Sequence, residues 1–151
     1  MDKSRKVLVV KQLTFDACHR LVNYDGKCNR LHGHTYKLEV GVKGVRDKRG
    51  LVIDFGELKN ILSKYLIDEG PTLDHNNLNE TMVKVDKHYE YVAENTTCEN
   101  MVDSIFAHLA PYVAEATHYK AELQFVKLWE TPTSYAIITK EDFENGGKYE
   151  C

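Results

Sequence analysis

The sequence lacks the features that direct a protein to a membrane, a nucleic acid or an oxidising compartment. No apolar run approaches the roughly 20 residues that cross a bilayer, and the apolar core at residues 7–10 is too short for a signal peptide. The net charge of −3 gives no basis for attracting nucleic acid or anionic lipid. No two cysteines have the CxxC spacing. We therefore expect a cytoplasmic protein with reduced cysteines and neither nucleic-acid nor membrane partners.

Internal repeats, low-complexity tracts and clear linkers are also absent from the sequence. A chain of 151 residues is of ordinary single-domain length, so we expect one domain spanning residues 1–151. The sequence contains no glycine-rich dinucleotide fingerprint, and we therefore expect no nicotinamide or flavin cofactor.

Apolar alternation and β-branched residues predict four strands, grouped in two pairs at the two ends of the chain. We expect these strands at residues 7–15, 37–43, 121–130 and 135–139. Two predicted helices lie between the pairs. Strands that are grouped rather than alternating with helices favour an α+β fold, here a four-stranded antiparallel sheet with two helices on one face. Because such a sheet leaves two open edges, we expect an oligomer.

The first predicted helix begins after Asp54, a favourable N-cap residue with Glu57 three positions later. Apolar side chains then recur at helical spacing over residues 58–66 and would form one buried face. We expect the pair Gly70-Pro71 to end this helix.

The second predicted helix starts at Thr96 or Thr97. Thr96 and Glu99 fit a capping box, and Pro111 is expected to mark the end of the helix. Residues 71–95, between the two helices, form a long polar stretch without strong periodicity. Stretches of this kind are often functional or lie at interfaces.

Three histidines in the N-terminal third have the spacing of a metal site. His32 and His34 are two residues apart next to a predicted strand, so both would project from one face. His19 ends an alternating run and can come from the neighbouring strand of a hairpin. Three imidazoles without a fourth protein ligand are typical of a catalytic zinc, because the open position accepts water or substrate.

Cys28 lies in the loop before these histidines, between the cations Lys27 and Arg30, which favour a thiolate. A thiolate beside a metal but not bound to it can act as a general base or a nucleophile. Alternatively, Cys28 is a fourth ligand that closes a structural site, or an inert thiol. The spacing alone leaves these alternatives open.

Two further positions carry chemically useful carboxylates. Asp74 and His75 are adjacent, and a Cys/His/Asp set can pass protons at neutral pH, although a turn aspartate with a solvated histidine explains the pair as well. Glu130 ends a predicted strand and can accept two parallel N–H bonds from a guanidine-like edge, or simply lie in water. Glu99 is most simply a capping residue.

Taken together, five motifs resemble the 6-pyruvoyl-tetrahydropterin synthase family, and the similarity extends from Phe15 to about Thr139. In chain order they are Phe-x-Ala-x-His ending at His19, Cys-x3-His-Gly-His starting at Cys28, Asp74-His75, Thr-x-Glu-Asn starting at Thr97, and Glu-Thr-Pro-Thr-Ser starting at Glu130.

The resemblance implies the tunnelling fold, in which the sheets of several subunits join into a barrel. It implies a homo-oligomer, a hexamer or tetramer, with active sites between the subunits. By motif position it implies a zinc ion held by three ligands, which are His19, His32 and His34.

The resemblance also assigns roles to the remaining candidates. It implies Cys28 as the proton-abstracting thiol, assisted by Asp74 and His75 from a neighbouring subunit. The implied substrate is a pterin triphosphate. Glu130 would anchor the amino edge of the ring, and two further positions would line the pterin pocket, which are Thr97 and Glu99.

The spacing within the cysteine motif distinguishes branches of the family. Three residues separate Cys28 from His32, as in the branch resembling 6-carboxytetrahydropterin synthase, which acts in queuosine precursor synthesis. The pyruvoyl branch typically has a longer spacing, and a third branch replaces the cysteine by glutamate. We therefore expect a carbon–carbon lyase of the carboxy type. The pyruvoyl enzyme, a three-histidine zinc hydrolase and a non-catalytic pterin-binding protein are the alternatives.

Overall fold

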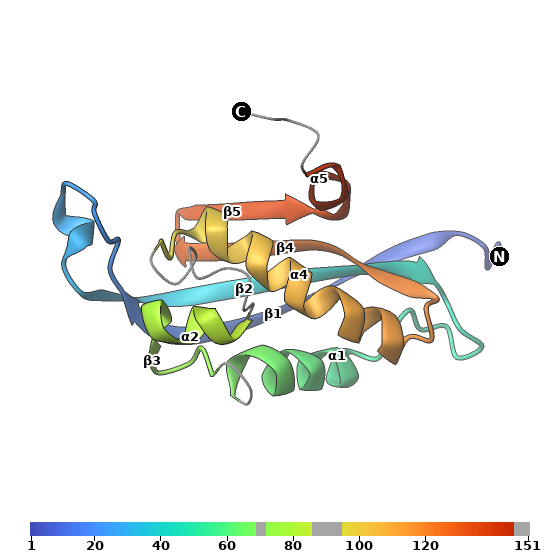
Figure 1. The fold of residues 1–151 in the computed structure, drawn as a ribbon. Helices are drawn as coiled ribbons and strands as arrows, with labels where there is room; N and C mark the ends of the chain where they lie inside the picture. The colour runs from blue at the N-terminus through green and yellow to red at the C-terminus, as the bar shows by residue number, and fades with distance from the viewer. Residues whose placement is uncertain (69–71, 86–94, 147–151) are drawn as a thin grey trace.

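The computed structural model describes residues 1–68, 72–85 and 95–146 (Figure 1). They form one twisted sheet with helices packed over one face, so the α+β prediction is confirmed. The elements in chain order are β1 (Lys6–His19), η1 (Lys27–Asn29), β2 (His32–Val45), α1 (Phe55–Leu62), η2 (Ser63–Ile67), β3 (Asn76–Asn77), α2 (Leu78–Val85), α4 (Cys98–Ala116), β4 (Ala121–Thr131), β5 (Ser134–Thr139) and α5 (Lys140–Asn145).

The sheet has five strands in the order β3-β1-β2-β4-β5. The prediction of a purely antiparallel four-stranded sheet is therefore wrong, because the two-residue strand β3 pairs parallel to β1 at Ala17 and Cys18. The four main strands are antiparallel to one another, as predicted. β1 and β2 are each 14 residues long, longer than predicted, because the polar residues at their ends remain in the ladder.

One face of the sheet carries the core. On β2, the side chains of Tyr36, Leu38, Val40 and Val42 point toward the helices and are fully buried. Phe15 on β1 packs against Tyr36, with ring centroids 5.1 Å apart and nearly parallel planes. Because successive side chains of a strand point to opposite faces, the buried residues in the middle of β1 and β2 fix which residues at the strand ends face the helices.

Helix α1 begins where the sequence predicts, since the Asp54 carboxylate accepts a hydrogen bond from the amide of Glu57. The helix continues as the π-helical turn η2, and together they bury the apolar face that includes Leu58 and Leu66. The predicted stop at Gly70-Pro71 lies outside the described residues. Helix α2 is a feature that the sequence did not predict within the polar stretch; it buries Leu78 and Met82.

Helix α4 begins at one of the two threonines that the sequence predicts, but its capping contacts and its C-terminal end differ from the prediction. Its N-cap is Thr97, whose hydroxyl accepts from the amide of Asn100, and Thr96 forms no capping box with Glu99. The helix also continues past Pro111 to Ala116. A proline inside a helix costs about 3 kcal/mol, but Val113 beyond it is fully buried, so packing against the sheet offsets part of that cost.

Among the described residues, no helix combines the length and apolar character needed to span a bilayer. Cys18, Cys28 and Cys98 are all free thiols.

Gly44 on β2 tests how tightly the sheet is built. It pairs with Ala121, and an added Cβ would lie 2.7 Å from the carbonyl oxygen of Lys120 and 2.8 Å from the Cα of Ala121. Those are backbone atoms that cannot rotate away. We therefore expect Gly44→Ala to lower the free energy of unfolding by about 1–3 kcal/mol, although alanine is otherwise the better strand residue. Urea denaturation measures the change. Lys43→Ala, at the exposed neighbouring position, is the control, and equal stability of the two variants would contradict the prediction.

Candidate functional site

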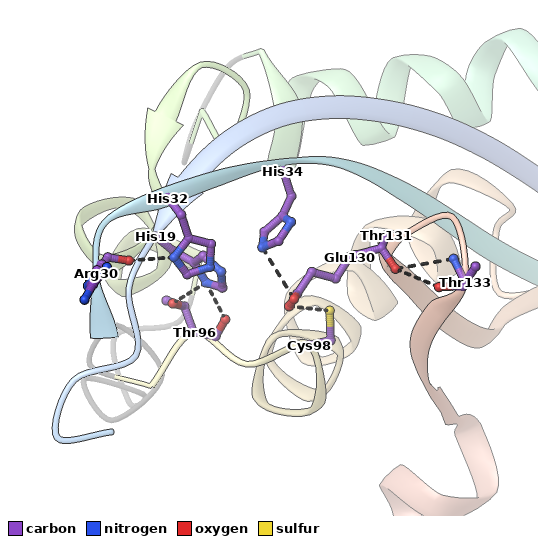
Figure 2. A network of polar contacts seen from close by, with 9 residues as sticks. All are labelled: His19, Arg30, His32, His34, Thr96, Cys98, Glu130, Thr131 and Thr133. Atoms are coloured by element: carbon purple, nitrogen blue, oxygen red, sulfur yellow. Dashed lines mark hydrogen bonds and ion pairs between the residues drawn. The ribbon is translucent and has the colours of Figure 1, made fainter. Parts of the chain in front are cut away.

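The three predicted metal-ligating histidines lie together at one end of the sheet (Figure 2). The antiparallel register places His19 of β1 directly opposite His32 of β2, and His34 follows two residues later on the same face. The three ring centroids are 4.7 to 5.3 Å apart. One nitrogen from each ring lies within 4.8 Å of the other two, so the three residues can share a metal ion.

The hydrogen bonds of two of these rings identify the nitrogens that face inward. Nδ1 of His19 donates to the carbonyl oxygen of Thr96 and shares its hydroxyl, each at 3.0 Å. Nδ1 of His32 donates to the carbonyl oxygen of Arg30 at 2.6 Å. Since a carbonyl can only accept, both rings carry their proton on Nδ1 and present the Nε2 lone pair. A metal-ligating histidine is typically oriented in this way.

The electrostatics also fit a cation. Nε2 of His19 and Nε2 of His34 are buried, and within the part of the chain that the structure describes neither has a hydrogen-bond partner, although the Glu130 carboxylate lies 3.4 Å from that of His34. Burial lowers the pKa of both imidazoles, because it disfavours their charged form, and the neutral ring is the form that binds a metal. A buried lone pair without a partner is costly, and a metal ion would satisfy both. The donor set therefore fits a three-histidine centre with an open position.

Glu130, at the end of β4, lies beside this cluster. Its Oε1 is 3.4 Å from Nε2 of His34, and its Oε2 is 3.8 Å from the sulfur of Cys98 (Figure 2). His34 and Glu130 together line a cavity of about 480 Å³, which also includes Lys37 and Trp129. That volume is within the range of small-molecule sites.

Cys28 lies in the short 3-10 helix η1 of the loop between β1 and β2, and its side chain is half-buried. Its carbonyl oxygen accepts from the amide of Leu21 at 2.8 Å, which ties the two sides of the loop together. Within the described residues, the metal-ligand cluster contains the three histidines and not Cys28. The structure thus does not favour the alternative in which Cys28 closes a four-ligand site.

Asp74 and His75 form a pair, with Oδ2 of Asp74 2.9 Å from Nδ1 of His75. The other carboxylate oxygen of Asp74 accepts from the amide of Asp16, and this bond is the main cause of a lowered Asp74 pKa. The carboxylate in turn raises the pKa of His75. His75 lines a second cavity that shares Gly33, His34 and Thr35 with the first, and its side chain is 78% exposed.

The remaining predicted residues lie at the start of α4. Thr97 caps the helix and Glu99 is exposed in its first turn; neither lines the cavity next to Glu130. Their contact with a substrate stays a prediction.

Sequence reasoning missed Thr96, which accepts a hydrogen bond from His19, and Cys98, which contacts Glu130. It also missed Tyr36, whose fully buried hydroxyl has no hydrogen-bond partner among the residues that the structure describes. No pattern in the sequence signals these contacts, because each joins distant segments.

Comparison with known proteins supplies the family. The family model described as 6-pyruvoyl tetrahydropterin synthase matches residues 8–141. A protein of Haemophilus influenzae named 6-carboxy-5,6,7,8-tetrahydropterin synthase is 34% identical over 84% of this chain and 94% of its own length. A protein of Dictyostelium discoideum named 6-pyruvoyl tetrahydrobiopterin synthase is 32% identical over 91% of this chain and 99% of its own length.

The solved structures agree with these matches. The structure of Caenorhabditis elegans 6-pyruvoyl tetrahydropterin synthase is similar to this fold, with a TM-score of 0.70, 28% identity, and coverage of 92% of this chain and 99% of that chain. The chain therefore belongs to the 6-pyruvoyl tetrahydropterin synthase family, as its motifs predicted.

The Asp74–His75 pair provides a prediction about charge. Because Asp74 raises the pKa of His75, the folded protein favours the protonated imidazole. The resulting stabilisation is fully present below the pKa of an unfolded histidine and is lost as the pH rises through the folded value. An NMR titration of the histidine ring protons should give a His75 midpoint above the ordinary value. Asp74→Asn should lower this midpoint, whereas Asp47→Asn, a distant carboxylate, should not. If the His75 midpoint were the same in the wild type and in Asp74→Asn, the pair would not form in solution.

Proposed function

We propose that the protein is a zinc-dependent 6-carboxy-5,6,7,8-tetrahydropterin synthase. Its substrate would be 7,8-dihydroneopterin triphosphate, and its products 6-carboxytetrahydropterin, acetaldehyde and triphosphate, serving queuosine precursor synthesis. The observation that carries the proposal is the three-histidine cluster with inward lone pairs beside Glu130, at a cavity of about 480 Å³. A metal for the side chain of the substrate and a carboxylate for its ring are then side by side.

The choice of the carboxy reaction rests on two observations. Three residues separate Cys28 from His32, the spacing that resembles the carboxy branch. Relatives that are 31–36% identical over about 85% of the chain are named 6-carboxy-5,6,7,8-tetrahydropterin synthase, including those of Haemophilus influenzae and Rickettsia typhi. The Dictyostelium relative carries the pyruvoyl name at 32% identity, so the product itself must be tested.

The proposed metal is zinc, held by His19, His32 and His34. When bound, it would supply Lewis acidity at the side-chain oxygens of the substrate. Thr96 and the carbonyl of Arg30 keep two of these rings in the tautomer that ligates. Glu130 would accept N–H bonds from the amino edge of the pterin, which fixes the ring relative to the histidines.

Proton transfer is assigned to Cys28 and to the Asp74–His75 pair. Cys28 would remove a proton from the substrate side chain as a thiolate, and His75, oriented by Asp74, would carry protons. The exposure of His75 supports its supply to the site of a neighbouring subunit.

An oligomer is further supported by the outer edge of β1, where Val7, Leu8 and Val10 are about 40% exposed. Thr97 and Glu99 are proposed to line the pterin pocket of the assembled oligomer.

The experiment that tests the reaction is mass spectrometry of the products after incubation of zinc-loaded protein with 7,8-dihydroneopterin triphosphate. Acetaldehyde and a 6-carboxypterin species are expected. A 6-pyruvoyl product would move the chain to the pyruvoyl branch. Unchanged substrate would overturn the proposed activity in favour of a three-histidine hydrolase or a pterin-binding protein.

Removal of the thiol tests the role of Cys28. In Cys28→Ala we expect kcat to fall by about 10²- to 10⁴-fold, because the proton-abstracting group is gone. Zinc content, measured by atomic absorption, should equal that of the wild type, since the metal cluster does not include Cys28. Loss of zinc would instead identify Cys28 as a ligand. Full activity with zinc bound would favour hydrolysis by a metal-activated water.

A further inference from the structure

The Glu130 carboxylate has an unusual set of partners. Its contacts in the structure are His34 at 3.4 Å on Oε1 and the thiol of Cys98 at 3.8 Å on Oε2. Within residues 1–68, 72–85 and 95–146, no lysine or arginine forms an ion pair with it. The orientation of this half-buried carboxylate therefore depends on neutral neighbours.

The contact with His34 uses the nitrogen that faces the metal cluster. Nε2 of His34 is one of the nitrogens that approach one another closely enough to share a metal. A nitrogen that gives its lone pair to a metal cannot at the same time make this contact as a hydrogen-bond donor or acceptor. The Cys98 contact does not compete with a metal in this way, because the sulfur binds the other carboxylate oxygen.

Cys98 is well fixed for such a task. It is the first residue of α4, directly after the capping residue Thr97, and only 7% of its surface is exposed. Burial, followed by the nearby Glu130 charge, raises the pKa of the thiol to about 12. The sulfur is therefore protonated at neutral pH and acts as an S–H donor rather than as a nucleophile.

We propose that Cys98 is a positioning residue for Glu130, whose thiol donates to Oε2 and turns the carboxylate toward the cavity. The inference rests on the proposed function, because it assigns to Glu130 the binding of the pterin ring. Its chemical logic is that an arginine would occupy both carboxylate oxygens and compete with the N–H edge of the ring. A single weak thiol donor leaves most of the lone pairs of the carboxylate available.

The first test measures binding of unsubstituted pterin by fluorescence quenching, together with steady-state kinetics. For Cys98→Ala we expect the pterin Kd and the substrate KM to rise about 3- to 10-fold, with kcat changed by less than about twofold and zinc content unchanged. Cys98→Ser retains a donor and should stay within about twofold of the wild type. Val102→Ala, four residues further along α4, removes a larger buried volume than Cys98→Ala does, and controls for loosening of the helix.

The second test needs no substrate. The S–H stretching band of Cys98, assigned from the infrared difference between wild type and Cys98→Ser, should be shifted by its hydrogen bond to the carboxylate. Glu130→Gln should move this band toward that of a free thiol. A band that does not respond to Glu130→Gln would overturn the proposal whether or not Cys98→Ala folds.

The two tests separate failure of the inference from failure of the proposed function. Wild-type binding of pterin, with Cys98→Ala binding equally well, would overturn the positioning role and leave the proposed function in place. Equal weakening in Cys98→Ala and Val102→Ala would also overturn it, because a structural loss would then explain both. A wild type that binds no pterin overturns the proposed function and the positioning role together, even if the infrared band confirms the contact.

Discussion

The register between β1 and β2 is the constraint on which the site depends. It is fixed over 14 residue pairs, from Lys6 opposite Val45 to His19 opposite His32. A slip of one residue would turn the histidines to the opposite face. The apolar part of the same strands prevents this slip, because Phe15 and Tyr36 stack on the core side next to the histidines. The packing energy of the core is thus also what places the metal ligands, and the candidate metal centre is a continuation of the hydrophobic face rather than a separate loop structure.

Placing three imidazoles at the end of an apolar face creates a solvation problem that α4 partly solves. The Nδ1 proton of His19 is bonded by both oxygen atoms of Thr96, the residue just before the helix. Thr96 is fully buried and contacts His19, and Thr97 is the residue that caps α4. The start of the helix therefore serves two elements at once. One threonine satisfies a histidine, and the next satisfies the helix amides.

The sequence was most informative where contacts are local or periodic. Alternation predicted the four main strands, helical spacing predicted α1, and the close spacing of His32 and His34 predicted their shared face. It was least informative where the partner is distant. His19 and Thr96 are 77 residues apart, and Cys98 and Glu130 are 32 apart, so no local pattern relates them. Local rules also gave a wrong capping pair and a wrong end for α4. The oxygens of Thr96 bond His19 instead of forming a capping box with Glu99, and the burial of Val113 offsets the cost of Pro111 inside the helix.

The charge balance of the site indicates what can complete it. Burial keeps His19 and His34 neutral, and the nearby carboxylate of Glu130 has no cationic partner within the part of the chain that the structure describes. Lys37 and Lys127 lie over the ring of Trp129, the residue beside Glu130, and not against the carboxylate. Unshared lone pairs on two buried nitrogens are unfavourable on their own, because these atoms have lost water and accept no hydrogen bond among the described residues. Within the same residues, the half-buried carboxylate of Glu130 has only the weak thiol donor of Cys98 on one of its oxygens. A divalent cation at the histidines and an N–H-rich ring at Glu130 would supply the missing partners. The arrangement therefore favours a ligand that brings hydrogen-bond donors to Glu130. It disfavours a ligand that brings further negative charge to that part of the cavity.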